Sequence, residues 1–176
     1  SVMNLGILMV QGLVNSFGVL VMAAFAVVVK IESFAYLPEQ ELGNAFSIFI
    51  AQNYGAKKML RIRKGIKSAT KIITIYGLVT SVLIILFAKP LLTIFVSAQE
   101  TEILQIGTQY LFIVSGFYCL IGYLFMFYGL YRGIGKPETS IILTVISLGT
   151  RVVLAYSLSS ITSIGLVGIW WAIPIG

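Results

Sequence analysis

The sequence alternates between long apolar stretches and short polar ones. Six apolar segments can be marked, and most are about 20 residues long or more, the length that an α-helix needs to cross a bilayer. Most also lack the polar face that a helix of a soluble bundle shows. The predicted segments are 2–17, 19–54, 66–88, 103–131, 138–157 and 164–176. The pattern therefore predicts an all-α fold, a polytopic membrane helical bundle with about six transmembrane segments.

The ends of several segments carry their own signals. The first and last segments are short for a span, and we expect both to be truncated. The chain begins with Ser1, which suggests a piece of something longer. Lys89 and Pro90 are expected to stop the third segment, because proline lacks the backbone donor and disfavours helix in the residue before it. Residues 91–96 then read as a short cap at the membrane interface.

The second segment is apolar but carries charge near its middle. As one helix, residues 18–55 would rise about 55 Å, against a hydrocarbon core of roughly 30 Å. Glu39 and Glu41 fall close to its centre, where a charged side chain costs about 2.5 to 3.5 kcal/mol on insertion scales. Pro38 is expected to bend the helix. A position this costly indicates a function.

One face of this segment collects polar and small residues. Glu32, Tyr36, Glu39, Gly43 and Ser47 follow one another at steps of three and four residues, which aligns them on an ideal helix. The alignment predicts a polar stripe on one face of the helix, with a register that the bend at Pro38 disturbs between its two halves.

Composition supports a membrane location. The mean hydropathy is +1.01, and charged residues make up 10% of the chain, against about 25% in soluble proteins. The net charge of +6 is concentrated between residues 57 and 71, which hold seven of the 12 basic residues. These are Lys57, Lys58, Arg61, Arg63, Lys64, Lys67 and Lys71. Such a cluster beside a span marks the cytoplasmic side and can contact anionic lipid, and no nucleic-acid partner is expected.

The other loops agree with this orientation. If loop 57–71 is cytoplasmic, alternation places loop 132–138 on the same side and the loops near 15–18, 97–102 and 157–163 outside. The three outer loops contain no Lys or Arg. The chain is thus expected to be a multi-pass protein of the cell membrane.

Residue types that most enzymes need are missing. The sequence has no histidine and one cysteine, Cys119, so neither a zinc site nor an internal disulfide is expected. Gly135 and Lys136 do not complete a phosphate-binding loop, because Pro137 follows them and Leu130 stands where the first glycine is required. We therefore expect no enzyme activity, no metal and no cofactor other than a coupling ion.

The polar residues within the segments are the candidates for function. A buried carboxylate can exchange a proton or hold a cation or a cationic substrate. The alternative is that these acids pair with basic groups on neighbouring helices. The candidates for ion or substrate binding are Glu32, Glu39, Glu41, Tyr36, Gln11 and Asn44. The candidates for a structural polar role are Gln52, Asn53, Arg132 and Arg151.

Two features of the 103–131 segment concern packing. It is rich in aromatic residues, which serve the core and an interfacial belt or, alternatively, form the wall of a cavity for flat apolar ligands. Gly129 and Gly133 have the four-residue spacing that lets helices approach closely.

Several longer motifs resemble those of a known family. They are VNSFG (14–18), AAFAVVVKIESFAYLP (23–38), GNAFSIFIAQNYGAKK (43–58), YGLYRGIGKPETS (128–140), VISLGTRVVLAY (145–156) and GLVGIWWAIPIG (165–176). On these motifs the chain resembles the C-terminal half of a multidrug and toxic compound extrusion (MATE) transporter, and it is similar to bacterial members in particular. The match runs from the seventh family helix to the start of the twelfth.

The resemblance implies one lobe of a twelve-helix transporter built from two six-helix lobes. Such transporters export small organic compounds, often cationic, in exchange for H⁺ or Na⁺ by alternating access. The missing N-terminal lobe would then be a partner of this chain. Glu32 matches an acidic position in the eighth helix of close relatives. Gln11 stands on the seventh helix, where other branches place an acid, which speaks against a sodium site of that type.

Three other functions remain open at this stage. A lipid-linked glycan flippase of the related superfamily would have a wide cationic cavity and would not respond to ion gradients. A membrane enzyme is disfavoured by the missing histidine. A non-functional fragment or interaction lobe is the last alternative, because both end segments look truncated.

Overall fold

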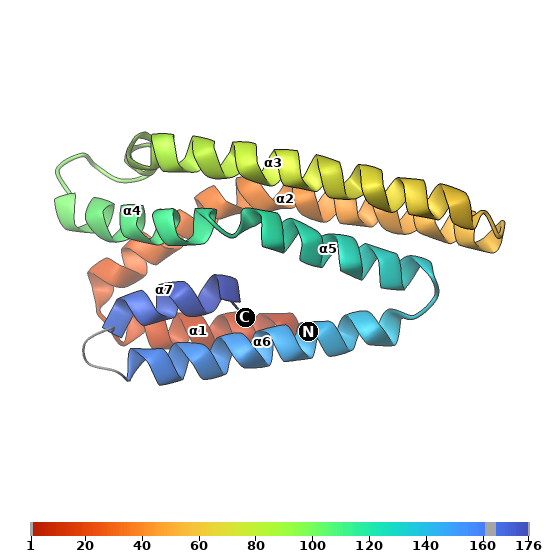
Figure 1. Ribbon diagram of the computed structural model, residues 1–176. Coiled ribbons are helices and arrows are strands. Elements are labelled where there is room, and N and C mark those ends of the chain that lie inside the picture. The colour runs from red at the N-terminus through yellow and green to blue at the C-terminus, as the bar shows by residue number, and fades with distance from the viewer. Residues whose placement is uncertain (1, 161–164, 176) are drawn as a thin grey trace. The chain divides into compact units, whose positions relative to one another are not determined.

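The computed structural model describes residues 2–160 and 165–175, and within these ranges it contains helices and no strand. Figure 1 shows the helices in chain order. They are α1 (Val2–Asn15), α2 (Val19–Gly55), α3 (Met59–Thr93), α4 (Thr101–Ser115), α5 (Tyr118–Gly133), α6 (Pro137–Ser159) and α7 (Gly165–Ile175). The all-α membrane fold expected from the hydropathy pattern is confirmed.

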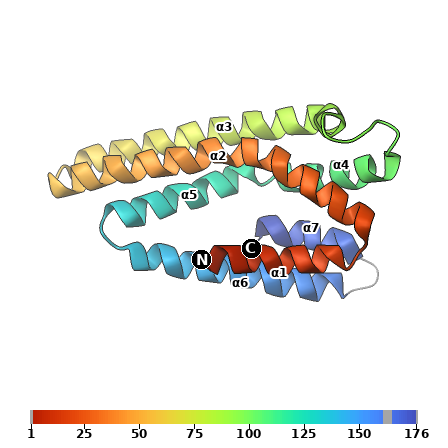
Figure 2. The ribbon, with the colours of Figure 1, turned by 180° about the vertical axis from the view of Figure 1, so that it is seen from behind.

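The helices form two compact units, and α2, α3 and α6 each contribute to both. The first unit contains residues 1–32, 82–116 and 144–176. Within it, α7 packs against α4 and α1, as both views show (Figures 1 and 2). Its core includes Val28, Leu92, Leu111 and Trp170, whose side chains are fully buried.

The second unit contains residues 33–81 and 117–143. The later part of α2, the earlier part of α3 and α5 lie side by side in it (Figures 1 and 2). Its buried apolar cluster takes side chains from all three helices. These are Phe46, Ile50, Ile62, Ala69, Ile73 and Met126.

Glycines bring α5 close to α2 in the second unit. A Cβ atom added at Gly43 would lie 2.7 Å from the carbonyl oxygen of Phe125, and one at Gly133 would lie 2.7 Å from that of Ser47. Gly129 approaches the backbone of Gly43 in the same way. The predicted close approach at Gly129 and Gly133 is confirmed, because side chains there would separate the two backbones.

The structure corrects two predicted helix ends. The third segment does not stop at Lys89, because α3 continues through Pro90 to Thr93, so residues 91–93 are helix rather than part of a separate cap. Proline is tolerated inside membrane helices, where neighbouring groups can bond the carbonyl that it leaves free. The same helix begins at Met59 rather than near residue 66, so the basic stretch is helical too.

The third correction concerns residues 103–131, which form two helices rather than one. The chain leaves helical geometry at Phe117, where φ is −110° and ψ is 2°, and α5 begins after it. Hydropathy could not indicate this break, because the residues on both sides of it are equally apolar. Part of the predicted 164–176 segment, residues 164 and 176, lies outside the described residues.

Several helices are long and apolar enough to cross a membrane. Within the described ranges these are α2, α3 and α6, and α4 with α5 supplies a fourth if the pair is one broken span. The helices α1 and α7 of the predicted six are shorter than a span. Large apolar side chains of α3 are exposed, among them Val79, Val82 and Leu86. This exposure suits a helix whose outer face contacts lipid.

Candidate functional site

Glu32 has a tyrosine partner in the first unit. The Tyr110 hydroxyl donates a hydrogen bond of 2.7 Å to Oε2 of Glu32, which joins α4 to α2. Tyr110 is buried, with 1% of its surface exposed, and Glu32 is partly buried. A hydroxyl donor fixes the direction of a carboxylate without neutralising it, so Glu32 keeps its capacity to bind a proton or a cation.

Aromatic rings pack against Tyr110, and one basic residue interacts with Glu32. The ring of Tyr110 meets that of Trp170 edge to face at 4.8 Å between centroids, and Phe25 stacks on Trp170 at 5.9 Å. Arg151 on α6 interacts favourably with the charge of Glu32. The first unit thus brings a carboxylate, a guanidinium and three packed aromatic rings close together.

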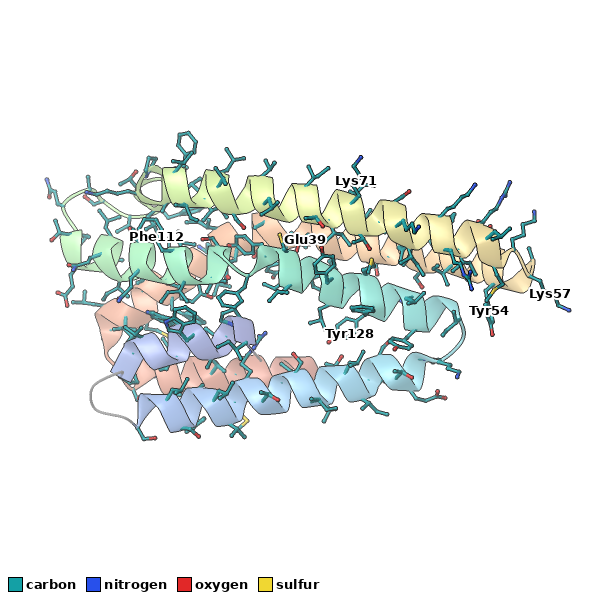
Figure 3. The ribbon with its side chains drawn as sticks, viewed as in Figure 1. Glu39, Tyr54, Lys57, Lys71, Phe112 and Tyr128 are labelled. Carbon is teal, nitrogen blue, oxygen red and sulfur yellow. The ribbon has the colours of Figure 1, made fainter. Side chains whose placement is uncertain are left out.

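Glu39 lies in the interior of the second unit (Figure 3). Its side chain is 2% exposed, and neither carboxylate oxygen has a hydrogen-bond partner within the described part of the chain. Gly122 of α5 faces it, and a Cβ atom there would lie 3.0 Å from Oε1 of Glu39. Among the described residues, therefore, no basic side chain is hydrogen-bonded to Glu39.

Glu41 belongs to a hydrogen-bonded chain near the end of α5. Nδ2 of Asn44 donates to Oε1 of Glu41 at 3.4 Å. Arg132 donates to Oδ1 of Asn44 at 2.8 Å through one terminal nitrogen and to Oγ of Ser47 at 3.3 Å through Nε. These bonds tie the last turn of α5 to α2, which is the kind of link expected of Arg132 as a structural residue.

The remaining candidates are dispersed. Tyr36 and Gln11 are partly buried, and Gln52 is exposed. Asn53 is buried and donates a hydrogen bond of 2.8 Å to the carbonyl oxygen of Phe49, within its own helix. The functional and structural roles assigned to these residues stay predictions.

A groove of about 610 Å³ opens in the first unit but does not include the acids. It is bordered by Lys89, Gln105, Gln109 and Phe112 among others. None of the candidate carboxylates lines it, so it is not the site that the sequence indicates.

Two of the residues grouped with Glu32 in the first unit were not singled out from the sequence. Tyr110 is 78 residues from Glu32, and Trp170 comes from the last helix. Both are aromatic, a property shared by many residues of the chain, so no local pattern distinguishes them. Only the packing of α4 and α7 in the first unit brings these rings together.

Comparisons with known proteins agree with this architecture. The MatE family model matches residues 2–157. The chain is 31% identical over 162 residues to the probable multidrug resistance protein YoeA of Bacillus subtilis. This match covers 92% of the chain and 35% of YoeA. It is 29% identical to the probable multidrug resistance protein YpnP of the same organism, over 81% of the chain and 32% of YpnP. The chain thus spans about a third of the length of these relatives.

Solved structures show the same fold. A MOP superfamily transporter from Pyrococcus furiosus superposes with a TM-score of 0.91 at 24% identity, over 98% of this chain and 39% of that one. The MATE transporter VcmN from Vibrio cholerae superposes with a TM-score of 0.88 at 21% identity, over 98% of this chain and 39% of that one. Together with the family match and the apolar helices, these findings show a multi-pass membrane protein. The chain belongs to the MatE family, the multidrug and toxic compound extrusion transporters.

Proposed function

We propose that this chain is the C-terminal transmembrane lobe of a secondary active transporter that exports organic, often cationic, compounds in exchange for H⁺ or Na⁺ by alternating access. The two relatives named as multidrug resistance proteins support export as the function. The chain covers 35% of the first of them, which supports a second, N-terminal lobe as its partner. The cell membrane is the proposed location, with the stretches 57–71 and 132–138 on the cytoplasmic side.

The pair formed by Glu32 and Tyr110 carries this proposal. A carboxylate held by one hydroxyl at 2.7 Å can release and regain a proton or a cation as its surroundings change. The ring of Tyr110 packs against Phe25 and Trp170, which holds its hydroxyl in place beside the carboxylate. Arg151 on α6 provides a competing positive charge for the carboxylate after the coupling ion has left.

Efflux of a fluorescent cationic dye tests the proposal, with the full-length transporter that contains this chain expressed in cells. We expect Glu32→Gln to lower gradient-driven efflux by about tenfold or more, because interactions of a charged group are worth about 1.5–3 kcal/mol. Glu100→Gln, in the exposed 97–102 loop, is the matched control and should leave efflux unchanged. Membrane abundance of each variant is measured in parallel.

Three outcomes would overturn the proposal. Unchanged efflux in Glu32→Gln would remove the acid from the transport cycle. Dye movement that does not respond to ion gradients would favour the flippase alternative. Full gradient-driven efflux by the chain alone would show that it needs no second lobe.

A further inference from the structure

The carboxyl group of Glu39 fills a space that the backbone of α5 leaves open. A Cβ atom at Gly122 would lie 3.0 Å from Cδ and Oε1 of Glu39 and 2.6 Å from Cγ2 of Ile73. No other residue type fits at position 122 without displacing one of these groups. In the second unit, the carboxyl group of Glu39 on α2 and the side chain of Ile73 on α3 therefore pack directly against Gly122 of α5. We call the position of this carboxyl group beside Gly122 the chamber.

The polar groups near this chamber are bonded elsewhere. On α3, Thr74 donates to the carbonyl oxygen of Thr70 at 2.7 Å, so its contact of 2.6 Å with Tyr123 of α5 has the tyrosine as donor. Tyr76 donates to the carbonyl oxygen of Ala35 at 3.0 Å. Neither tyrosine hydroxyl is left to donate to Glu39, whose two oxygens have no partner within the described residues.

The charged and titratable groups around the chamber do not compensate a negative charge. The titratable group of α5 that interacts with Glu39 is the thiol of Cys119, which would repel the carboxylate if it ionised. Lys71 of α3 is exposed and points away from Glu39, on the far side of its helix (Figure 3). On α2 itself, Glu41 is exposed and bonded to Asn44. With respect to the described residues, an ionised Glu39 would thus be a buried charge without a hydrogen-bonded counter-charge, at a cost of several kcal/mol.

A proton is the cation that fits this chamber. Metal cations are held by several oxygen or nitrogen ligands at once, and no group of three or more His, Cys, Asp or Glu side chains converges within the described residues. A proton needs one oxygen, and it turns the carboxylate into a neutral group that is far cheaper to bury. The described surroundings therefore supply no cluster of acidic, Cys or His ligands for a metal ion, whereas the single carboxyl group suffices for H⁺.

We propose that Glu39 is a proton-binding site, occupied while α2, α3 and α5 pack as they do here and emptied only when the packing at Gly122 opens to water. The site lies in the second unit and does not include Glu32. Its use in transport rests on the proposed function, but its occupancy by a proton is testable without transport.

Infrared spectroscopy of the full-length transporter in detergent tests the site directly. We expect the wild type at neutral pH to show the carbonyl stretch of a protonated carboxylic acid without a hydrogen bond, and Glu39→Gln to lose that band. Glu41→Gln, two residues along the same helix and exposed, is the matched control and should retain it. Glu39→Met fills a similar volume without polar atoms and serves as the reference if the glutamine variant does not fold.

Two results of this experiment would contradict a protonated Glu39. If Glu39→Gln and Glu39→Met lose only ionised-carboxylate absorption, Glu39 is charged in the packed state and the inference is wrong. A protonated band that persists in both variants has the same meaning, because it then belongs to another acid. Failure of the dye-efflux test leaves this spectrum unaffected, so the two proposals fail separately.

Discussion

Tyr110 is the residue that gives Glu32 a fixed direction. Tyr110→Phe removes one oxygen and leaves the ring in its contacts with Phe25 and Trp170. We expect a loss of about 1–3 kcal/mol in the free energy of unfolding, because a buried group loses its hydrogen-bond partner. Urea unfolding in detergent measures the change.

Tyr54→Phe is the control for this substitution. Tyr54 is 47% exposed and lies near Lys57 at the end of the second unit (Figure 3). Its variant should match the wild type. Equal stability of the Tyr54 and Tyr110 variants would show that the bond to Glu32 contributes nothing to folding.

The acids of α2 show how far single residues could be understood from the sequence. Their spacing identified Glu32 and Glu39 as members of one stripe, because helical periodicity is a local property. Their different surroundings could not be inferred. Tyr110 reaches Glu32 from 78 residues away, and the space for Glu39 exists because position 122 lacks a side chain. Both depend on how separate helices pack.

Among the helices, α5 depends most on close approach. Gly43→Ala adds a methyl group 2.7 Å from the carbonyl oxygen of Phe125, a backbone atom that cannot rotate away. We expect a loss of about 1–3 kcal/mol in unfolding free energy, because α2 and α5 must separate to admit it. Thermal unfolding followed by circular dichroism measures the loss.

Gly149→Ala is the matched control for the helix contact. Gly149 also lies within a helix, α6, and a Cβ atom there meets nothing within 4 Å. Alanine should stabilise this position by roughly 0.5–1 kcal/mol through helix propensity. A loss of stability at Gly149 equal to that at Gly43 would mean that helix contact is not the cause.

Helix boundaries were harder to predict than helices. The apolar runs are long, so their helical nature follows from hydropathy alone. Hydropathy does not register Phe117, where the backbone changes direction between two equally apolar stretches, or Pro90, which α3 incorporates. Both outcomes depend on which backbone groups neighbouring helices can satisfy.

For the whole molecule, the orientation in the membrane is the main prediction. Cys119 is the one cysteine of this sequence, so Cys119→Ala, together with replacement of any cysteine in the rest of the transporter, provides a background for single-cysteine labelling. In that background, we expect Lys64→Cys and Lys136→Cys to react with an impermeant maleimide only after the membrane is permeabilised. Gln99→Cys should react in intact cells, because its loop lacks basic residues.

The three positions control one another. Labelling of Gln99→Cys in intact cells shows that the reagent works, and protection of the two lysine positions shows that the cells are sealed. Reaction at Lys64→Cys in intact cells would invert the proposed topology. The experiment uses the transporter of full length, whose insertion includes both lobes.

The outer face of α3 has a consequence for how this protein can change over time. Val79, Val82 and Leu86 are exposed, whereas Leu92 on the same helix is fully buried. Lipid tails contact apolar side chains of any shape. The exposed residues can therefore be substituted freely during evolution as long as the replacements are apolar. At Leu92 a replacement must also have a shape that fits the surrounding core side chains. We therefore expect the exposed side of α3 to tolerate any apolar substitution. The buried side should tolerate only apolar residues of similar shape.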